Sequence, residues 1–284
     1  MKLAVITDSS ATLSEKYLKF DNLHVLDIPL TLDKVTYKSS EISAQDYFDL
    51  MAKAKGLPQS AQPSVAKLEE LLNDLRDQGY SHVLGLFLPS GISGFYENAY
   101  YLQEEFTDMK VVFPETFITS SPLGYMVETM LEAAVRNLSF DEIYKIFEEM
   151  RDTDGAFMLV DDLKWLAKSG RLSNGAAILG TLFGVKPVLT FSKIGKVELF
   201  EKVRTNKKSI ARMKELLLEN TDPKSHKIFI LQARAEDKVK EFYDFAIAQG
   251  YTDVEILDFG SVIATHLGLG ASAYTFGKKI FEDK

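Results

Sequence analysis

Residues that could bind a small anion are concentrated in four loops of the chain. The loops span 8–10, 60–64, 90–94 and 260–270, and they are rich in serine, threonine, glycine and histidine. Each loop is expected to follow a strand, and open α/β sheets bind their ligands outside the carboxyl ends of strands. Hydroxyl and imidazole groups there could donate hydrogen bonds to a carboxylate or a phosphate. These loops are therefore the candidate binding segments.

The loop 90–94 has the strongest local case for anion binding. It places Ser93 at the start of a helix expected over 95–106, where free backbone N–H groups and the helix dipole favour an anion. A helix cap without a ligand is the structural alternative. The segment 91–95 lacks the glycine that the nucleophile elbow G-x-S-x-G requires after its serine. The pattern therefore favours binding over nucleophilic attack by Ser93.

His266 is the histidine with the clearest functional setting, because it lies among glycines that allow close approach of the backbone. An imidazole in apolar surroundings is most often a satisfied core residue, and this alternative stays open. No two histidines have the spacing of metal ligands, and the chain contains no cysteine. The segment 268–273 resembles a dinucleotide loop, but an apolar, strand-like run follows it. No metal and no cofactor are expected.

The loops 8–10 and 60–64 carry weaker signals. An aspartate at a strand end, such as Asp8, is as common in turns as in ligand sites. Ser64 can cap the helix that follows it, so a cap is the simpler interpretation of its loop. Taken alone, neither loop identifies a site.

The second half of the chain contains an apolar stretch and a basic stretch. A helix expected over 172–183 has almost no polar face, so it is either core or a wall against which an alkyl chain lies. The stretch 202–214 contains six basic residues and no acidic one, and it is either a solvated helix face or a docking patch for an acidic partner. The apolar side chains of this stretch include Ile178, Leu179, Leu182 and Phe183.

In the first half of the chain, the elements that must position these loops alternate between strands and helices. This alternation is typical of a parallel sheet with helices on both faces. The expected strands cover 3–7, 24–30, 82–88 and 110–113, and 34–37 is expected to return as a hairpin after the second of them.

The second half of the chain predicts a different sheet. Segments 188–192 and 196–200 flank a short turn with glycine, which predicts an antiparallel hairpin within a mixed sheet. A change of pattern near 151–155 marks a domain boundary. We therefore expect an N-terminal α/β domain, 1–152, and a C-terminal α/β domain, 153–284.

Composition excludes several classes of protein. The chain has 284 residues and is 46% hydrophobic, which is enough for one large or two medium domains with packed cores. Its net charge of -8 gives no field that would attract nucleic acid. Asp8 interrupts the first apolar run too early for a signal peptide, and no run of about 18 apolar residues predicts a membrane span. We expect a cytoplasmic protein.

Taken together, the segments resemble the DegV family, whose members include the FakB subunits of bacterial fatty acid kinases. Seven segments match in order along the whole chain, and an ordered set is far more specific than any one of them. The segments are Thr7-Asp8-Ser9, Ser60-Ala61-Gln62-Pro63-Ser64, Ser90-Gly91-Ile92-Ser93-Gly94-Phe95-Tyr96, Ser169-Gly170-Arg171-Leu172-Ser173, Val185-Lys186-Pro187, Val203-Arg204-Thr205 and Thr265-His266-Leu267-Gly268.

The resemblance implies two α/β domains with a fatty acid in the cleft between them, the carboxylate at the cleft and the chain in an apolar tunnel. The acyl-chain pocket is then expected in the C-terminal domain, 153–284, with Ile178, Leu179, Leu182 and Phe183 as its residues. Ser93 matches the serine that hydrogen-bonds the carboxylate in the family. Ser60 and His266 match a hydroxyl residue and a histidine near the acid group. Thr265 and Gly94 complete the expected carboxylate site.

The resemblance also implies contact with a partner protein. Arg171 and Arg204 match arginines of the family, and we expect both to serve partner contact, Arg204 above all because it lies in the basic stretch. Two departures occur. Ala61 stands where the family usually has a second hydroxyl residue, which removes one carboxylate donor. Glu115-Thr116 replaces a common Asp-Ser pair after the fourth strand, so the resemblance leaves the role of these two residues open.

The leading hypothesis is a non-catalytic carrier that buries a long-chain fatty acid and presents its carboxylate to a separate fatty acid kinase, which returns an acyl phosphate. Because the chain has no nucleotide loop, the partner would perform the phosphoryl transfer. Transient contact with a membrane surface is compatible with this role. A second hypothesis is a lipid esterase or acyltransferase with Ser93 as nucleophile and His266 as base. A third is a lipid sensor that acts without a kinase.

Overall fold

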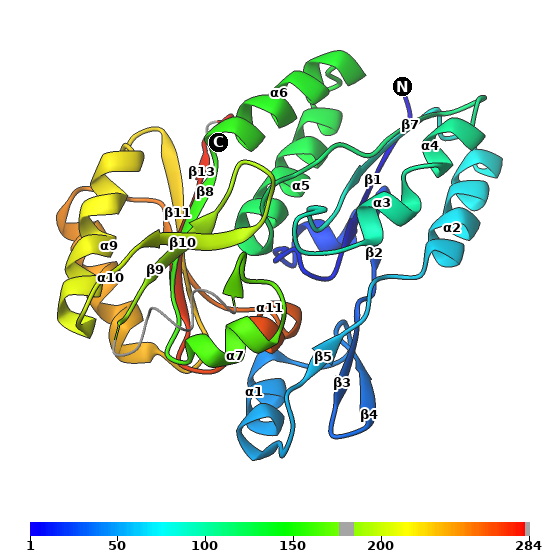
Figure 1. The fold of residues 1–284 in the computed structure, drawn as a ribbon. Helices are drawn as coiled ribbons and strands as arrows, with labels where there is room; N and C mark the ends of the chain where they lie inside the picture. The colour runs from blue at the N-terminus through cyan, green and yellow to red at the C-terminus, as the bar shows by residue number, and fades with distance from the viewer. Residues whose placement is uncertain (176–184, 282–284) are drawn as a thin grey trace.

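The N-terminal half is built on a four-stranded parallel sheet with the order β2-β1-β6-β7 (Figure 1). The computed structural model of the chain describes residues 1–175 and 185–281. Because all four strands run in the same direction, the loops that follow them gather at one edge of the sheet. The strands are β1 (Leu3–Asp8), β2 (Leu23–Leu26), β6 (His82–Leu86) and β7 (Lys110–Val112).

Alternate residues of β1 pack against helices on opposite faces of this sheet. Ala4 and Ile6 share a core with α2, α3 and α4, whereas Leu3 and Val5 share another with α5 and α6. Side chains of a strand alternate between faces, so an apolar strand needs cover on both, as the sequence predicted. The helices are η1 (Tyr17–Lys19), α2 (Val65–Asp77), α3 (Phe95–Ala99), α4 (Leu102–Glu105), α5 (Ser120–Val135) and α6 (Phe140–Thr153).

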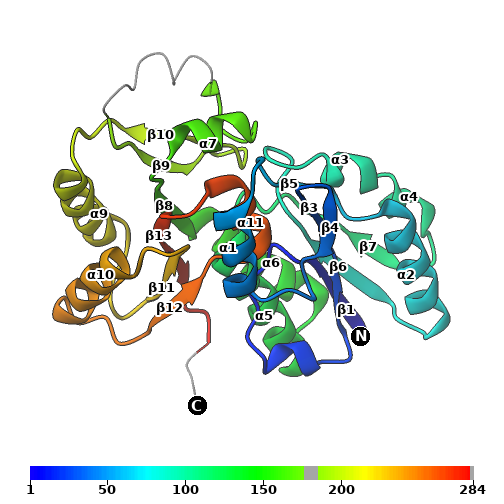
Figure 2. The same cartoon turned by 90° about the horizontal axis from the view of Figure 1, so that it is seen from below.

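A small antiparallel sheet with the order β4-β3-β5 lies between β2 and α2 in the chain. Its hairpin turns at Asp33 and Lys34, which both have positive φ, as two-residue hairpin turns require. Helix α1 follows the hairpin and lies beside α11 of the C-terminal half (Figure 2). The elements are β3 (Pro29–Leu32), β4 (Val35–Lys38), α1 (Ala44–Lys53) and β5 (Gln59–Ser60).

The C-terminal half contains a six-stranded mixed sheet with the order β10-β9-β8-β13-β11-β12. β11 and β12 are parallel, and the other neighbours are antiparallel, which confirms the mixed sheet and the β9–β10 hairpin. The strands are β8 (Gly155–Leu159), β9 (Val188–Phe191), β10 (Val197–Glu201), β11 (His226–Gln232), β12 (Val254–Asp258) and β13 (Ser272–Lys278).

The two faces of this sheet contribute to different cores. Phe157 and Leu159 pack with α9 and α10 on one face, while Met158 and Val160 pack with α7, α11 and α1 on the other. Helix α1 therefore belongs to the N-terminal half by sequence but covers the sheet of the C-terminal half. The helices are α7 (Leu163–Lys168), α9 (Asn206–Asn220), α10 (Glu236–Ala248) and α11 (Ser261–Leu267).

Three expected features differ from the structure. The helix predicted over 95–106 is broken into α3 and α4, because the N–H of Gln103 bonds three residues back to Tyr100 in the tighter pattern of a turn. Leu172 forms an isolated bridge with Val197 and does not begin a helix. The loop predicted over 260–270 contains α11, which the glycines on either side concealed.

The chain passes between the two halves within two residues. Helix α6 ends at Thr153 and β8 begins at Gly155. However, α5 and α6 also contact β13 of the second sheet, and Ala156 lies in the core of those helices. The two halves therefore share a core, and the division into 1–152 and 153–284 stays a prediction.

Candidate functional site

A cavity of about 390 Å³ lies where the loops after β5 and β6 face α7, α11 and the β9–β10 hairpin. This volume is within the usual range for small-molecule pockets. The polar residues of the lining are Ser60, Gln62, Ser90, Ser93, Thr119, Arg171 and His266. The apolar residues of the lining are Ala61, Leu88, Ile92, Met158, Leu166, Phe191, Val197, Val262, Ile263 and Leu267.

Ser60 and His266 are brought together across the two halves of the protein. The Oγ of Ser60 lies 2.7 Å from Nε2 of His266, although 206 positions separate them in the chain. Ser60 ends β5, where its pairing with Leu30 of β3 fixes the backbone, and His266 lies on α11. The structure thus joins two of the residues expected to bind a carboxylate.

The imidazole of His266 is neutral at physiological pH. Burial is the main cause that lowers the pKa of His266 to about 3, and the positive charge of Arg171 lowers it further. The Nδ1 atom is buried and has no hydrogen-bond partner among the residues that the structure describes. A neutral ring can donate through Nε2 to the Oγ of Ser60, and in that arrangement the hydroxyl proton of Ser60 is available to a ligand in the cavity.

Ser93 retains a hydroxyl proton that a ligand could accept. Its Oγ accepts a hydrogen bond from the N–H of Phe95 at 3.3 Å, and its own N–H donates to the carbonyl of Pro89 at 3.1 Å. The adjacent Gly94 also lines the cavity and precedes α3. Because α3 has five residues, its dipole is small, and the anion argument rests on the individual donors and not on a long helix.

Asp8 holds the loop that carries Ser93, and it does not reach the cavity. Its Oδ2 accepts from the N–H of Leu88 at 2.7 Å, and its Oδ1 accepts from both the N–H and the hydroxyl of Ser10. Burial of the carboxyl group raises the pKa of Asp8, and this effect outweighs the hydrogen bonds, which lower it. The strand-end aspartate is therefore a structural group, which ties the end of β1 to the end of β6.

The structure does not bring the hydroxyl of Thr265 to the cavity. The residue is fully buried, its Oγ1 donates to the carbonyl of Ser261 at 2.8 Å, and the same oxygen lies 2.7 Å from the hydroxyl of Tyr47. The hydroxyl therefore uses its proton and accepts a hydrogen bond within the protein. The expectation that Thr265 binds a carboxylate directly does not fit this geometry, because neighbours on a helix point about 100° apart and only His266 faces the cavity.

Arg171 and Arg204 lie in different places. Arg171 is half-buried in the cavity lining, where its Nη1 donates to the carbonyl of Ser169 at 2.7 Å. Burial lowers the pKa of Arg171, but an arginine side chain stays charged. Arg204 is exposed between β10 and α9. The expected partner contact stays a prediction for both residues: Arg204 lies on the surface, whereas Arg171 lines the cavity.

Thr119 is a cavity residue that the sequence analysis missed. Its Oγ1 donates to the hydroxyl of Ser10 at 2.9 Å, and Ser10 in turn donates to Asp8. The residue follows β7, so the rule that strand ends collect ligands could have found it. The expected acyl-chain residues Ile178, Leu179, Leu182 and Phe183 lie outside the described residues.

The arrangement gives little support to hydrolysis. The imidazole of His266 bonds Ser60 and not Ser93, so the expected nucleophile and base are not paired. A base with a pKa of about 3 is also too weak to activate a hydroxyl at neutral pH. Within the described residues, no group of three or more histidine, aspartate or glutamate side chains could hold a metal ion. No helix in that part of the chain is long and apolar enough to span a membrane.

Comparison with known families identifies the chain. The model of the DegV family, whose description reads "uncharacterised protein", matches residues 2–279. The chain belongs to the DegV family. A DegV domain-containing protein of Lactococcus lactis, YqaC, is 62% identical over 280 residues, which are 98% of this chain and 100% of the relative.

Solved structures of DegV proteins have the same fold. The fatty acid binding DegV family protein SAG1342 of Streptococcus agalactiae is 43% identical and has a TM-score of 0.94, over 98% of this chain and 99% of that one. DegV of Bacillus subtilis, described as a fatty acid binding protein, is 31% identical and has a TM-score of 0.86, over 98% of this chain and 100% of that one. The two-domain α/β fold expected from the sequence is therefore that of the family.

Proposed function

We propose that this DegV protein binds a long-chain fatty acid in the cavity between its two halves. The observation that carries the proposal is the composition of the lining, in which hydroxyl, imidazole and guanidinium groups accompany ten apolar side chains. A fatty acid has the same division into a polar head and an apolar chain. The similar structures from Streptococcus agalactiae and Bacillus subtilis, described as fatty acid binding, support the same ligand class.

The carboxylate would lie between Ser93, Ser60 and His266, near the backbone of Gly94. An acid that leaves water must replace its hydration with several donors, and the hydroxyls and the neutral imidazole supply them. Arg171 lies in the same lining and adds a positive charge that favours an anion. The head group therefore determines the orientation of the ligand.

The acyl chain would supply most of the affinity. Each buried methylene contributes about 0.8 kcal/mol, so a chain of about sixteen carbons is worth roughly 10 kcal/mol before the costs of association. Residues from β8, β9, β10, α7 and α11 form the apolar wall. A rigid sheet and two short helices thus share the wall, and the pocket belongs chiefly to the C-terminal half.

The finer part of the proposal is that the protein acts as a carrier for a fatty acid kinase, as a FakB subunit does. Four basic residues of the stretch 202–214 are exposed and form no ion pair with any described residue, namely Lys202, Arg204, Lys207 and Lys208. They could dock an acidic partner surface.

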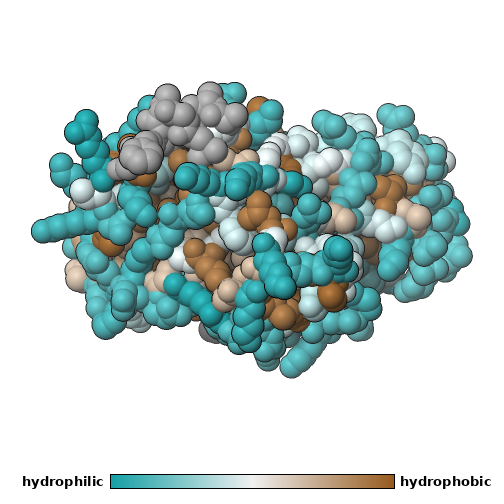
Figure 3. Space-filling view, turned by 60° about the horizontal axis from the view of Figure 1, so that its bottom comes forward, coloured by the Kyte–Doolittle hydropathy of each residue, from teal (hydrophilic) through white to brown (hydrophobic). Residues whose placement is uncertain are grey.

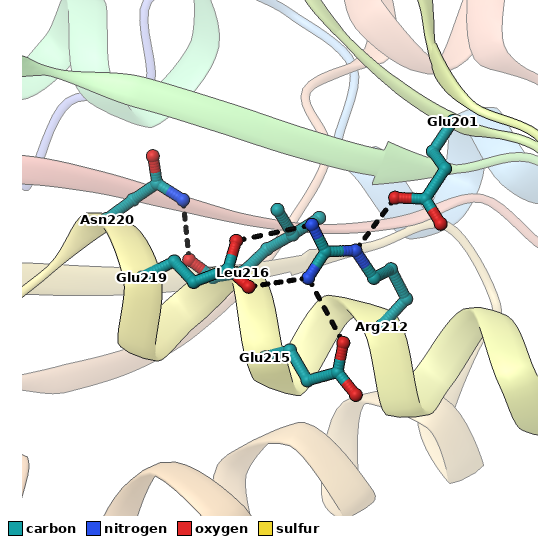
Figure 4. Close-up of polar contacts among 6 residues, drawn as sticks. All are labelled: Glu201, Arg212, Glu215, Leu216, Glu219 and Asn220. Carbon is teal, nitrogen blue, oxygen red and sulfur yellow. Dashed lines mark hydrogen bonds and ion pairs between the residues drawn. The ribbon is translucent and has the colours of Figure 1, made fainter.

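The C-terminal part of the basic stretch is neutralised within the protein. Arg212 pairs with Glu201, Glu215 and Glu219 at 2.7 to 3.1 Å (Figure 4), and Lys214 pairs with Glu241. The proposed docking patch is therefore confined to 202–208. On the face seen in Figure 3, hydrophilic residues cover most of the surface and hydrophobic ones form small separate groups, so a brief membrane contact would depend on local groups.

Native mass spectrometry tests the ligand class. We expect protein purified from bacteria to carry a mass corresponding to one long-chain fatty acid, and delipidated protein to take up palmitate or oleate with a stoichiometry of one. An unliganded native mass, together with no uptake of either acid, would refute the proposal. Hydrolysis of an activated ester that disappears with Ser93→Ala would instead favour the esterase hypothesis.

A further inference from the structure

Tyr47 connects the small N-terminal sheet to the helix that carries His266. The residue lies on α1 and is fully buried, and its hydroxyl is 2.7 Å from Oγ1 of Thr265 on α11, at a separation of 218 positions. Figure 2 shows α1 and α11 side by side where the two halves meet. A buried side-chain hydrogen bond thus joins the halves one residue before His266.

Proton accounting gives this hydrogen bond a direction. Thr265 has one hydroxyl proton, which it donates to the carbonyl of Ser261 at 2.8 Å. Its oxygen must therefore accept from Tyr47. On the other side, the indole Nε1 of Trp165 donates to the carbonyl of Thr265 at 3.0 Å. The residue before His266 is held by α1 through its side chain and by α7 through its backbone.

Helix α11 depends on such contacts for its position. It has seven residues, and its N-cap Gly260 supplies no side-chain hydrogen bond. A helix of this length is not stable without tertiary packing. Apolar side chains of α1, among them Phe48 and Met51, pack in the same core as α11. The other polar links between α1 and the C-terminal half in the described residues, Gln45 with Asp258 and Asp49 with Arg234, lie at the surface. Exposed pairs contribute little to stability, so the buried Tyr47 hydrogen bond is the strongest polar constraint on α11 from α1.

We propose that Tyr47 is a positioning residue, which holds α11 so that His266 meets Ser60 and faces the cavity. The proposal uses the fatty acid site proposed above for its ligand, but the position of His266 can be measured without any ligand. Tyr47 acts through Thr265, which explains why a residue next to His266 is buried and fully hydrogen-bonded instead of lining the cavity.

The test compares delipidated wild-type protein with Tyr47→Phe, which keeps the ring and removes the hydroxyl. We expect the imidazole ¹⁵N resonances of His266 to shift in the unliganded variant, and the affinity for oleate to fall about five- to tenfold, the usual effect of one buried hydrogen bond. The resonances are read at neutral pH, where the ring is neutral.

The protein contains a matched control. The hydroxyl of Tyr251 lies 2.6 Å from Oγ1 of Thr221, which donates to the carbonyl of Leu217 four residues earlier, as Thr265 does to Ser261. Tyr251 is also buried, and it packs in the core on the opposite face of the sheet. We expect Tyr251→Phe to lower stability as Tyr47→Phe does, while the His266 resonances and the oleate affinity stay unchanged.

A double-mutant cycle tests the route through Thr265. Thr265→Val removes the acceptor, so adding Tyr47→Phe to it should cause no further loss of affinity. Thr265→Ser keeps the hydroxyl and should retain wild-type affinity.

Three results would overturn the proposal. They are unchanged His266 resonances in Tyr47→Phe, additive losses in the cycle, and equal losses of affinity in Tyr47→Phe and Tyr251→Phe. If wild-type protein takes up no fatty acid but the resonances still shift, the proposed function fails and the positioning role stands.

Discussion

At the scale of single residues, the candidate site is distinguished by polar groups that keep a donor or an acceptor without a hydrogen-bond partner in the described part of the chain. The hydroxyl proton of Ser93 and the Nδ1 atom of His266 have no acceptor or donor among the described residues. The hydroxyl of Thr265, by contrast, is used in both directions. A buried carboxylate needs donors that are not already engaged, which separates the first two residues from the third.

Ser93→Ala should weaken fatty acid binding. Loss of one hydrogen bond to a charged carboxylate costs about 1.5–3 kcal/mol, so we expect an affinity roughly ten- to a hundredfold lower, measured by calorimetry with delipidated protein. Ser40→Ala removes an exposed hydroxyl from the turn that follows β4 and serves as the control. Equal affinities of Ser93→Ala and wild type would exclude Ser93 from the head-group site.

The lowered pKa of His266 predicts a specific dependence of stability on pH. The unfolded protein binds a proton near the ordinary histidine pKa of 6.5, whereas the folded protein holds the pKa of His266 at about 3. The contribution is therefore fully present above pH 6.5 and is lost as the pH falls toward 3. In urea unfolding at pH 7 and pH 5, His266→Gln should lose less stability between the two pH values than wild type does. An identical loss in both proteins would contradict the assignment.

At the scale of elements, the β9–β10 hairpin of the C-terminal half packs against the loop 89–94 of the N-terminal half, which carries Ser93. A Cβ added to Gly195 at the hairpin tip would lie 2.4 Å from Cβ of Pro89, and one added to Gly91 would lie 2.5 Å from the tip backbone. The two glycines allow this approach, and Gly195 also has a φ of +70°. The position of the Ser93 loop thus depends on a contact with the second domain.

Gly195→Ala should therefore destabilise the protein and weaken binding. Gly250 provides the control, because it has a φ of +89° but no atom within 4 Å of an added Cβ. We expect Gly250→Ala to cost about 1 kcal/mol of unfolding free energy from backbone strain alone, and Gly195→Ala about 1–3 kcal/mol more from overlap with Pro89. Denaturant unfolding measures both. Equal losses of unfolding free energy in the two variants would show that the hairpin tip can move away from Pro89 without cost.

At the scale of the whole molecule, the site exists only where the two halves meet. Ser60 and Ser93 come from the first half, and His266 and Arg171 come from the second. Helix α1 crosses to cover the second sheet, so the halves are interleaved and not merely joined. Binding a ligand between them should stabilise both, because the cavity is lost when either unfolds.

Arg204→Ala tests the proposed kinase coupling, which involves the outer surface of the molecule. Its side chain is exposed and does not line the cavity, so fatty acid affinity should be unchanged. With a fatty acid kinase from the same cell, we expect slower formation of acyl phosphate at limiting carrier concentration. Lys19→Ala, which removes an exposed charge from the N-terminal half, should leave the rate unchanged. Equal losses of binding and coupling in Arg204→Ala would refute a docking role.

The helices and strands that the sequence predicted correctly are those set by local patterns of apolar and turn residues. The apolar run of β1 requires cover on both faces, and the turn between β9 and β10 requires a hairpin. The broken helix after Ser93 was not predicted, since its break depends on hydrogen bonds at Tyr100 that no residue type signals. Helix α11 was missed because its flanking glycines resemble a loop.

By itself, the sequence determined the alternation of strands and helices, the mixed second sheet and the segments that carry Ser60, Ser93 and His266, although not that His266 lies on a helix. Only the tertiary structure decided which of these groups meet. Ser60 reaches His266 and Thr265 turns to Tyr47, because α1 packs across α11. Such pairings depend on distances between segments more than 200 positions apart, and local composition and periodicity contain no information on those distances.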